Sequence, residues 1–173
     1  SSGNTAGAMA LVANRLGATC KLTCPETTSR SKIGYMKAFN AEVHECPDVD
    51  SDHPEHYRAV AQRLAEDEEG AFLVNQYYNQ NNPTVHYQWT GREISAQAGS
   101  DVTHLVSAMG TGGLLSGSAR RIKEEAEAVG RDVTVVGVDA EQSNISTAFY
   151  DEEPVPYDTT VEGLGKGGSL PTM

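Results

Sequence analysis

The chain has 173 residues, which suits one ordinary domain or two small lobes, and its 38% of apolar residues is enough to bury a core. Its formal net charge of −11, from 24 acidic against 13 basic residues, argues against nucleic-acid or anionic-membrane partners. No apolar run approaches the roughly 18 residues of a membrane span, so we expect no membrane-spanning segment.

The acidity has two interpretations that composition leaves open: an ordinary acidic soluble protein, or the solvating surface of a halophile, since five Lys stand against eight Arg. An odd number of cysteines without a secretory signal favours a reducing, cytoplasmic location. The cysteine spacing is poor for a metal, and the five histidines show no ligand-like spacing. We therefore predict no metal site and small buried thiols at Cys20, Cys24 and Cys46.

The first residues, "SSGNTAGAM", lack an initiator Met and already look like part of a motif. The last residues, "GGSLPTM", look like the beginning of a new element. We therefore expect the chain to be an internal piece of a longer protein.

In the first part of the chain, apolar periodicity predicts a helix over residues 6–16. Its apolar stripe comprises Ala8, Leu11, Val12 and Leu16. Gly17 follows as the closing residue, and residues 18–25 predict a short strand.

A second helix is predicted over residues 27–40, where Asn40 is suited to a left-handed cap. Residues 41–46 predict a strand, and a third helix begins at Tyr57. Residues 71–76, "AFLVNQ", predict a buried strand.

The pair Asn82–Pro83 predicts the start of the next helix, as N-cap and first helical residue. A strand over residues 103–109 and a helix over residues 114–129 flank a glycine-rich turn. A further strand covers residues 132–140, and the acidic stretch over residues 141–160 is loop-rich.

Strands that alternate with helices indicate an α/β fold of mainly parallel sheets covered by helices. The turn-rich stretch "YYNQNNP" is the predicted junction between two lobes. We expect residues 1–79 to belong to a smaller lobe and residues 80–173 to a larger one. In such sheets ligands bind beyond the carboxyl ends of strands, and two turns rich in small residues lie at such places.

The turn "GTGGLLSG" follows a strand and opens a helix. The amides of Gly110 to Gly113 can approach an anion without interference from a Cβ, and Thr111 offers a hydroxyl. This predicts a phosphate cradle made of backbone, although a tight turn without a ligand would have the same pattern. No Lys is near enough for a Walker A loop, and the glycine spacing makes a dinucleotide fingerprint a weak alternative.

The turn "SSGNTAG" offers hydroxyls from Ser1, Ser2 and Thr5, an amide from Asn4, and the N–H groups of a helix start. That set suits a small carboxylate, and a plain N-cap is the alternative. Together the two turns predict a phosphate-bearing ligand beside a carboxylate-bearing one.

Five segments occur in the order and approximate spacing of a known family: "SSGNTAG", "NQYYNQNNPTVHY" with "TGREI", "MGTGGLLSG", "VVGVDA" and "VEGLGKG". Over nearly its whole length the chain resembles the cysteine synthase and cystathionine β-synthase family, pyridoxal-phosphate enzymes of fold type II with a tryptophan synthase β-like fold. The resemblance implies pyridoxal 5′-phosphate as cofactor, an amino-acid substrate, a sulfur nucleophile and a homodimer.

The resemblance also implies roles for individual residues. The family's contacts to the substrate carboxylate match Ser1, Ser2, Gly3, Asn4, Thr5 and Gln76. Its contacts to the cofactor's 5′-phosphate match Gly110, Thr111, Gly112 and Gly113. Asn4 also resembles a residue near the ring hydroxyl of the cofactor, and Gly163 resembles a glycine whose backbone lines the active site.

Three departures from the family pattern matter. Leu114 stands where the family usually has Thr, and Ala6 stands where it usually has Gly. The family's Schiff-base lysine precedes the segment that matches Ser1, so no catalytic residue is assigned in this chain. We expect these 173 residues alone to be inactive.

Four activities stay open from the sequence. The leading hypothesis is cysteine synthase, which would combine an activated serine such as O-acetylserine with sulfide. Cystathionine β-synthase, with homocysteine as the nucleophile, comes second, and a serine/threonine dehydratase-like lyase third. A dinucleotide-binding oxidoreductase is the alternative from another class.

Overall fold

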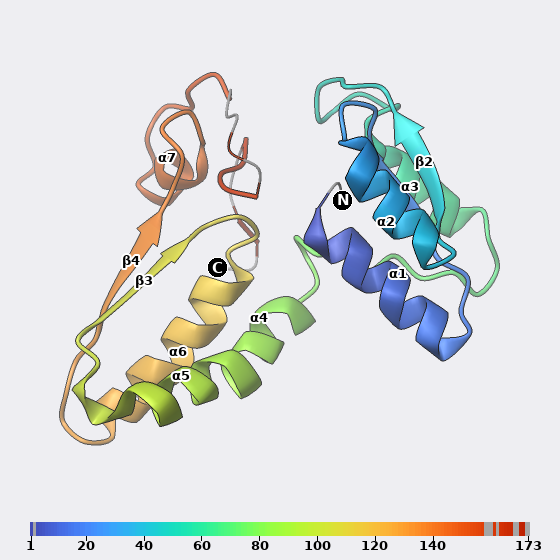
Figure 1. Ribbon diagram of the computed structural model, residues 1–173. Helices are drawn as coiled ribbons and strands as arrows, with labels where there is room; N and C mark the ends of the chain where they lie inside the picture. The colour runs from blue at the N-terminus through green and yellow to red at the C-terminus, as the bar shows by residue number, and fades with distance from the viewer. Residues whose placement is uncertain (2, 158–160, 162, 168–169, 172–173) are drawn as a thin grey trace. The chain divides into compact units, whose positions relative to one another are not determined.

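The computed structural model describes the chain except for residues 2, 158–160, 162, 168–169 and 172–173 (Figure 1). The chain divides into two compact units, Ser1–Leu73 and Val74–Met173. Among the described residues, each unit contains a parallel strand pair with helices beside it. The predicted α/β class with parallel strand pairing is therefore confirmed.

The described residues of the first unit are organised around β1 and β2, which run parallel with Leu22 opposite Val43. A helix connects the two strands, which is the usual connection between parallel neighbours. In chain order the elements are α1 (Asn4–Leu16), β1 (Lys21–Pro25), α2 (Arg30–Ala38), β2 (Glu42–Cys46) and α3 (Tyr57–Glu66).

Local sequence signals determine where α1 and α2 end. Gly17 closes α1 in the left-handed conformation, with φ +69°, and Ala18 donates its N–H to the Ala13 carbonyl at 2.9 Å. Asn40 follows α2 with φ +62°, a conformation that asparagine tolerates better than most residues. Both predicted caps are confirmed.

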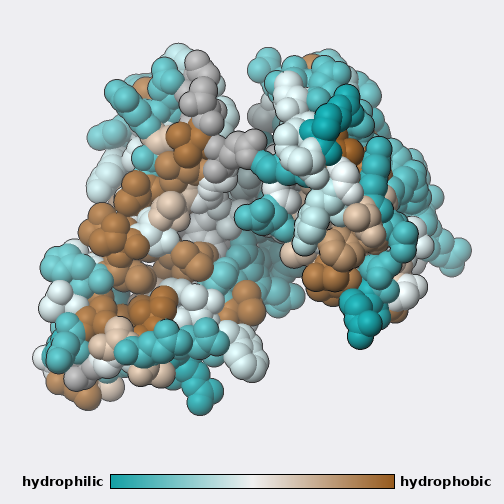
Figure 2. All heavy atoms as spheres, in the orientation of Figure 1, coloured by the Kyte–Doolittle hydropathy of each residue, from teal (hydrophilic) through white to brown (hydrophobic). Residues whose placement is uncertain are grey.

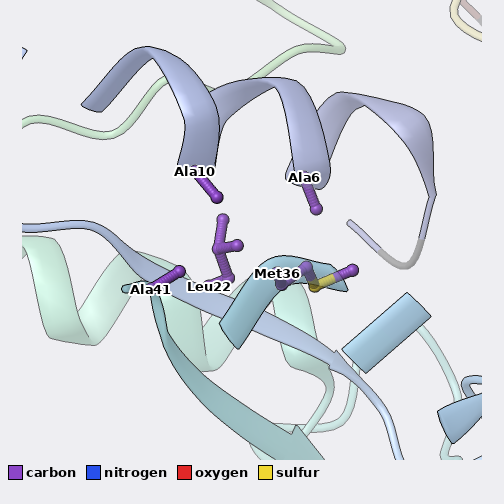
Figure 3. Close-up of a cluster of buried hydrophobic side chains, with 5 residues drawn as sticks. All are labelled: Ala6, Ala10, Leu22, Met36 and Ala41. Atoms are coloured by element: carbon purple, nitrogen blue, oxygen red, sulfur yellow. The ribbon is translucent and has the colours of Figure 1, made fainter. Parts of the chain in front are cut away.

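The core of the first unit lies between α1, α2 and β1 (Figure 3). Ala6 and Ala10 point from α1 toward the side chains of Leu22 and Met36. Small side chains on this face allow close packing, and a Cβ on Gly7 would collide with the ring of Tyr35. Ala6 is completely buried, so its methyl group, absent from the usual family glycine, is accommodated.

The apolar stripe predicted on α1 is not its packing face. Leu11, Val12 and Leu16 are 40%, 55% and 77% exposed. Two stripes of apolar residues share this helix, and the one that packs carries the smaller side chains of Ala6, Gly7 and Ala10. Periodicity detects both stripes, but only the tertiary contacts select between them.

The described residues of the second unit place helices against β3 and β4, which run parallel with Val106 opposite Val136. A helical run precedes β3 and includes a π-helical segment, η1. The elements are α4 (Asn81–Val85), η1 (His86–Thr90), α5 (Gly91–Ala98), the 3₁₀ turn η2 (Gly99–Asp101), β3 (His104–Ala108), α6 (Gly113–Glu127), β4 (Thr134–Val138) and α7 (Ile145–Phe149).

The strand pair of the second unit has one packed face and one exposed face. The packed face meets the core cluster Met109, Leu115, Ile145 and Leu170. On the other face, Val106 is 61% exposed and Val136 39% exposed, and Figure 2 shows apolar atoms, in brown, gathered over these strands. Parallel strands in proteins are normally covered on both faces. The described residues leave this face uncovered.

Two predictions near residue 74 are wrong. Residues 71–75 form no strand, and Phe72 is 75% exposed instead of buried. A strand needs a partner, which the composition of one segment cannot supply. The next helix begins at Asn81, with Gln80 in the N-cap position, so Asn82 is not the cap. The side chain of Asn82 has other partners, described below.

Candidate functional site

The glycine-rich turn of the second unit joins the end of β3 to the start of α6. Gly112 occupies the N-cap position with φ +82° and ψ −18°, a left-handed conformation that favours glycine. The first N–H groups of a helix have no partner within the helix, and α6 is 15 residues long. The turn therefore combines backbone donors with the positive end of a helix dipole.

The other glycines of this turn lie against neighbouring backbone and side chains. A Cβ on Gly110 would lie 2.5 Å from the carbonyl oxygen of Gly163. A Cβ on Gly113 would collide with the side chain of Asn82. The turn thus lacks side chains for two reasons: Gly112 has a positive φ, and its neighbours have no room for a Cβ.

Gly163 belongs to a loop that packs against the end of β3. Gly165 donates its N–H to the Met109 carbonyl at 2.8 Å, and Lys166 donates its N–H to Ser143 Oγ at 2.9 Å. Gly163 itself has φ +79°. The structure therefore brings Gly163 beside the predicted phosphate turn.

Asn82 contacts two predicted site residues, and its sequence position did not indicate this. Its Nδ2 donates to the Gln76 carbonyl oxygen and to Thr111 Oγ1, both at 2.9 Å. The N–H of Gly113 lies 3.4 Å from the same Thr111 hydroxyl. One amide thus joins two residues, Gln76 and Thr111, that were predicted to contact different parts of the ligand. The sequence signal for Asn82 was its place before Pro83, which also indicates a helix cap.

The side chains that follow Thr111 offer little to a phosphate. Leu114 is 42% exposed and has no hydroxyl. Ser116 Oγ donates to the Gly112 carbonyl at 2.9 Å, within its own helix. Thr111 lies within the turn itself, so it stays the predicted hydroxyl contact to an anion.

In the first unit, the start of α1 lines a pocket of about 220 Å³. Gly3 and Asn4 line this pocket together with residues of α2, namely Ser31, Lys32, Tyr35 and Met36. The pocket thus combines an amide, hydroxyls and a cation near the starts of two helices, where helix dipoles favour negative charge. This composition suits a carboxylate.

The rest of the predicted carboxylate loop lies at the start of α1. Ser1 Oγ accepts the N–H of Gly3 at 3.5 Å, and Thr5 is exposed in the first helical turn. Ser2 lies outside the described residues. Lys32 also lines this pocket, and the sequence did not indicate this, because a lysine within a helix gives no signal of its own.

Neither a metal cluster nor a bilayer-spanning helix is found in the part of the chain that the structure describes. No three His, Cys, Asp or Glu side chains there are arranged to hold a metal ion, and no helix there is long and apolar enough to cross a bilayer. The three cysteines are free thiols; Cys24 and Cys46 are buried and Cys20 is half-buried. Burial raises the pKa of Cys20 and Cys46, which favours the protonated thiol over the thiolate.

Comparison with known proteins places these features in a family. The family model described as "Pyridoxal-phosphate dependent enzyme" matches residues 1–173. Cystathionine beta-synthase of Rattus norvegicus is 35% identical over 167 residues, which cover 95% of this chain and 29% of that protein. Cysteine synthase B of Escherichia coli (strain K12) is 36% identical over 143 residues, which cover 83% of this chain and 45% of that protein.

A solved structure is similar over almost the whole chain. It is the O-acetylserine dependent cystathionine beta-synthase from Helicobacter pylori, with a TM-score of 0.81 and 28% sequence identity. The match covers 98% of this chain and 55% of that one. The chain spans about three-tenths of the length of the rat cystathionine beta-synthase that it matches.

Proposed function

The chain belongs to the family of pyridoxal-phosphate dependent enzymes, and on this premise we propose that it serves a reaction in which a sulfur nucleophile replaces the β-substituent of an activated serine. The observation that carries the proposal is the glycine-rich turn of Gly110 to Gly113, in which Thr111 accepts a hydrogen bond from Asn82. Similarity to proteins named cystathionine beta-synthase and cysteine synthase supports this reaction class.

The turn of the second unit fits the phosphate of pyridoxal 5′-phosphate. Its donors are backbone N–H groups and the Thr111 hydroxyl, and a Cβ at Gly110 or Gly113 has no room. Such a cradle needs no Lys or Arg side chain. When bound, the cofactor supplies an electron sink for the negative charge that develops at the substrate Cα.

The pocket of the first unit would hold the carboxylate of the amino acid. Asn4 would donate its side-chain amide, and the Lys32 ammonium would add a charge-assisted contact from α2. Ser1, Thr5 and Gln76 stay proposed contacts to the same carboxylate. The contribution of these residues is orientation, because a fixed carboxylate aligns the Cα–H and the β-substituent for reaction.

The first candidate for the nucleophile is sulfide, as in a cysteine synthase. A second candidate is homocysteine, and one observation favours it. The rat cystathionine beta-synthase matches 95% of this chain, against 83% for the cysteine synthase of Escherichia coli. In both cases we propose a cytoplasmic homodimer. The first unit would supply the carboxylate contacts apart from Gln76, and the second unit would supply Gln76 and the phosphate contacts.

The test is an assay of the full-length protein with defined pairs of substrates. O-acetylserine, O-phosphoserine and serine are each combined with sulfide or with homocysteine, and the products are identified by mass spectrometry. We expect cysteine or cystathionine from at least one pair. If pyridoxal 5′-phosphate binds but no pair gives either product, β-replacement with sulfur is wrong although the cofactor assignment stands.

A further inference from the structure

We propose that Ser143 and Asn144 are positioning residues that hold the loop of residues 163–166 against the glycine-rich turn and so strengthen binding of the cofactor phosphate. This inference rests on the proposed function, because it concerns the same turn. Both side chains are buried, although serine and asparagine are mostly surface residues. Buried polar groups need hydrogen-bond partners, so the partners of Ser143 and Asn144 indicate what these two residues hold.

The hydroxyl of Ser143 bonds to both backbone groups of one residue, Lys166. Ser143 Oγ accepts the N–H of Lys166 at 2.9 Å and donates its proton to the Lys166 carbonyl oxygen at 3.1 Å. It also accepts the N–H of Ile145 at 3.3 Å. A hydroxyl offers one proton and two lone pairs, so these three bonds use all of them. Ser143 therefore fixes the backbone of Lys166 in position and in orientation.

Asn144 holds the same segment of chain at two points. Its backbone N–H donates to the Lys166 carbonyl oxygen at 2.7 Å. Its side-chain amide pairs with the backbone of Val155, because Nδ2 donates to the Val155 carbonyl oxygen at 2.8 Å and Oδ1 accepts the Val155 N–H at 2.7 Å. Two adjacent residues thus hold the backbone on both sides of Gly163 in the sequence.

The motif "VVGVDA" places Ser143 and Asn144 at the end of β4 (Figure 1). Its carboxylate, Asp139, accepts the N–H of Ala140 at 2.9 Å through Oδ1 and the N–H of Ser146 at 3.0 Å through Oδ2. Ser146 lies in α7, so Asp139 ties the end of the strand to the start of that helix. Ser143 and Asn144 lie between these two bonds, and the strand therefore determines where they stand.

The loop that these residues hold lies against the glycine-rich turn. Gly165 donates its N–H to the carbonyl oxygen of Met109, the residue before Gly110. The Gly163 carbonyl oxygen lies where it would collide with a Cβ on Gly110. On its other side the loop meets Ser143, since a Cβ on Gly165 would lie 3.0 Å from Ser143 Cβ. The loop is thus packed between Ser143 and the start of the turn.

This packing affects a phosphate because the turn is rich in glycine. Glycine loses more conformational freedom on ordering than any other residue, and the turn contains Gly110, Gly112 and Gly113. Ordering a flexible site during binding lowers its affinity, whereas a site that is already ordered binds more tightly. The loop orders the end of β3 and the start of the turn before a ligand binds. Ser143 and Asn144 thus strengthen phosphate binding without contacting the phosphate.

The test measures loop packing and cofactor affinity in the same variants of the full-length protein. Ser143→Ala removes both bonds from the hydroxyl to Lys166. We expect amide hydrogen exchange at Lys166 to become about tenfold faster, as for loss of a buried hydrogen-bond partner, and the affinity for pyridoxal 5′-phosphate to fall by a similar factor. Ser118→Ala is the matched control, because Ser118 is equally buried in the second unit and its Oγ has no hydrogen-bond partner among the described residues. It should change neither quantity.

A second variant disturbs the loop from its other side. Gly165→Ala places a Cβ against Ser143 in a left-handed backbone with φ +82°, and it should also weaken pyridoxal 5′-phosphate binding. Gly130→Ala has similar backbone strain, with φ +72° and no atom within 4 Å of the new Cβ, and should leave the affinity unchanged. In a Gly165→Ala background, Ser143→Ala should lower the affinity by less than about twofold, because both changes act through the same loop. The melting temperature of the cofactor-free protein is the folding control.

The outcomes separate this inference from the proposed function. Faster exchange at Lys166 with unchanged affinity for pyridoxal 5′-phosphate would overturn the positioning role while the phosphate turn stands. Fully additive losses in Ser143→Ala and Gly165→Ala, or equal losses in Ser118→Ala and Gly130→Ala, would do the same. A wild-type protein that does not bind pyridoxal 5′-phosphate would overturn the proposed function, and the positioning role with it.

Discussion

At the scale of single residues, Gly112 and Gly130 share a backbone conformation that favours glycine, but only Gly112 lies in the proposed phosphate turn. Both have a positive φ, +82° and +72°, so both backbones favour glycine over any residue with a Cβ. Gly130 follows α6 and has no atom within 4 Å of the place of a Cβ. Gly112 instead occupies the N-cap of α6 in the proposed phosphate turn. The same substitution at the two sites therefore has different consequences for a ligand.

We predict that Gly112→Ala and Gly130→Ala each lower the free energy of unfolding by about 1 kcal/mol, the cost of a left-handed alanine. Only Gly112→Ala should also weaken pyridoxal 5′-phosphate binding, by roughly tenfold or more, because backbone amides at this turn would shift. Thermal unfolding and equilibrium dialysis of both variants check this. Equal affinities in the two variants would remove Gly112 from the cofactor site.

We predict that Asn4→Ala raises the KM for the amino-acid substrate about tenfold while the protein keeps its melting temperature, because Asn4 is exposed and lines the pocket. Lys32→Met should act in the same direction by removing the positive charge. Asn14→Ala is the control on the same helix, since Asn14 is exposed and lies outside this pocket. Steady-state kinetics that show equal KM values for Asn4→Ala and Asn14→Ala would contradict the assignment.

At the scale of elements, α3 begins with an unusual cap. His56 is 7% exposed, and its Nδ1 accepts the N–H of Arg58 at 3.3 Å, a role that requires the ring nitrogen to be unprotonated. Burial lowers the pKa of His56, and the nearby Arg58 lowers it further, while Asp48 opposes the shift. The start of α3 is thus stabilised by a neutral histidine.

The stability of α3 should depend on pH. The pKa of His56 is lower in the folded state than the ordinary histidine pKa of about 6.5. As the pH falls below about 6.5, the unfolded chain therefore binds more protons than the folded chain. The contribution of His56 is therefore fully present above that pH and is lost as the pH falls below it. Replacing His56 with Asn, which also caps helices, should flatten this part of the pH profile. Urea unfolding between neutral and mildly acidic pH measures the effect, and an unchanged slope would contradict it.

The elements also show how far sequence can predict this structure. The ends of α1 and α2 follow from Gly17 and Asn40 because a left-handed cap depends on the residue itself. The packing face of α1 and the environment of Phe72 could not be predicted, since both depend on which elements lie nearby. Asn82 was assigned to a cap for the same reason: its partner Thr111 is distant in sequence.

The turns were predictable because their chemistry is local. A glycine-rich turn between a strand and a helix indicates an anion site at Gly110 to Gly113 wherever the helix lies. The contact of Gly110 with Gly163, and the pocket that joins Asn4 to Lys32, arise only when distant segments pack. The sequence thus predicts two ligand-binding turns, and the structure adds the residues that contact them.

At the scale of the whole molecule, the net charge of −11 should make stability depend on salt. Like charges repel in the compact state, and salt shortens the range of that repulsion from about 30 Å at ~0.01 M to about 3 Å at ~1 M. We predict that the melting temperature rises with NaCl over this range. A melting temperature that stays constant or falls with NaCl would contradict both the halophile interpretation and the destabilising repulsion between like charges.

The segment at residues 71–75 has a consequence for limited proteolysis. Proteases bind substrates as irregular or extended chain, and Phe72 is 75% exposed in a stretch without helix or strand. Phe149 is comparably exposed, at 70%, but it lies at the end of α7. A brief chymotrypsin digest should therefore cut after Phe72 before it cuts after Phe149. Such a cut falls one residue before the boundary between the two units, so it would release each unit for a direct test of whether it folds by itself.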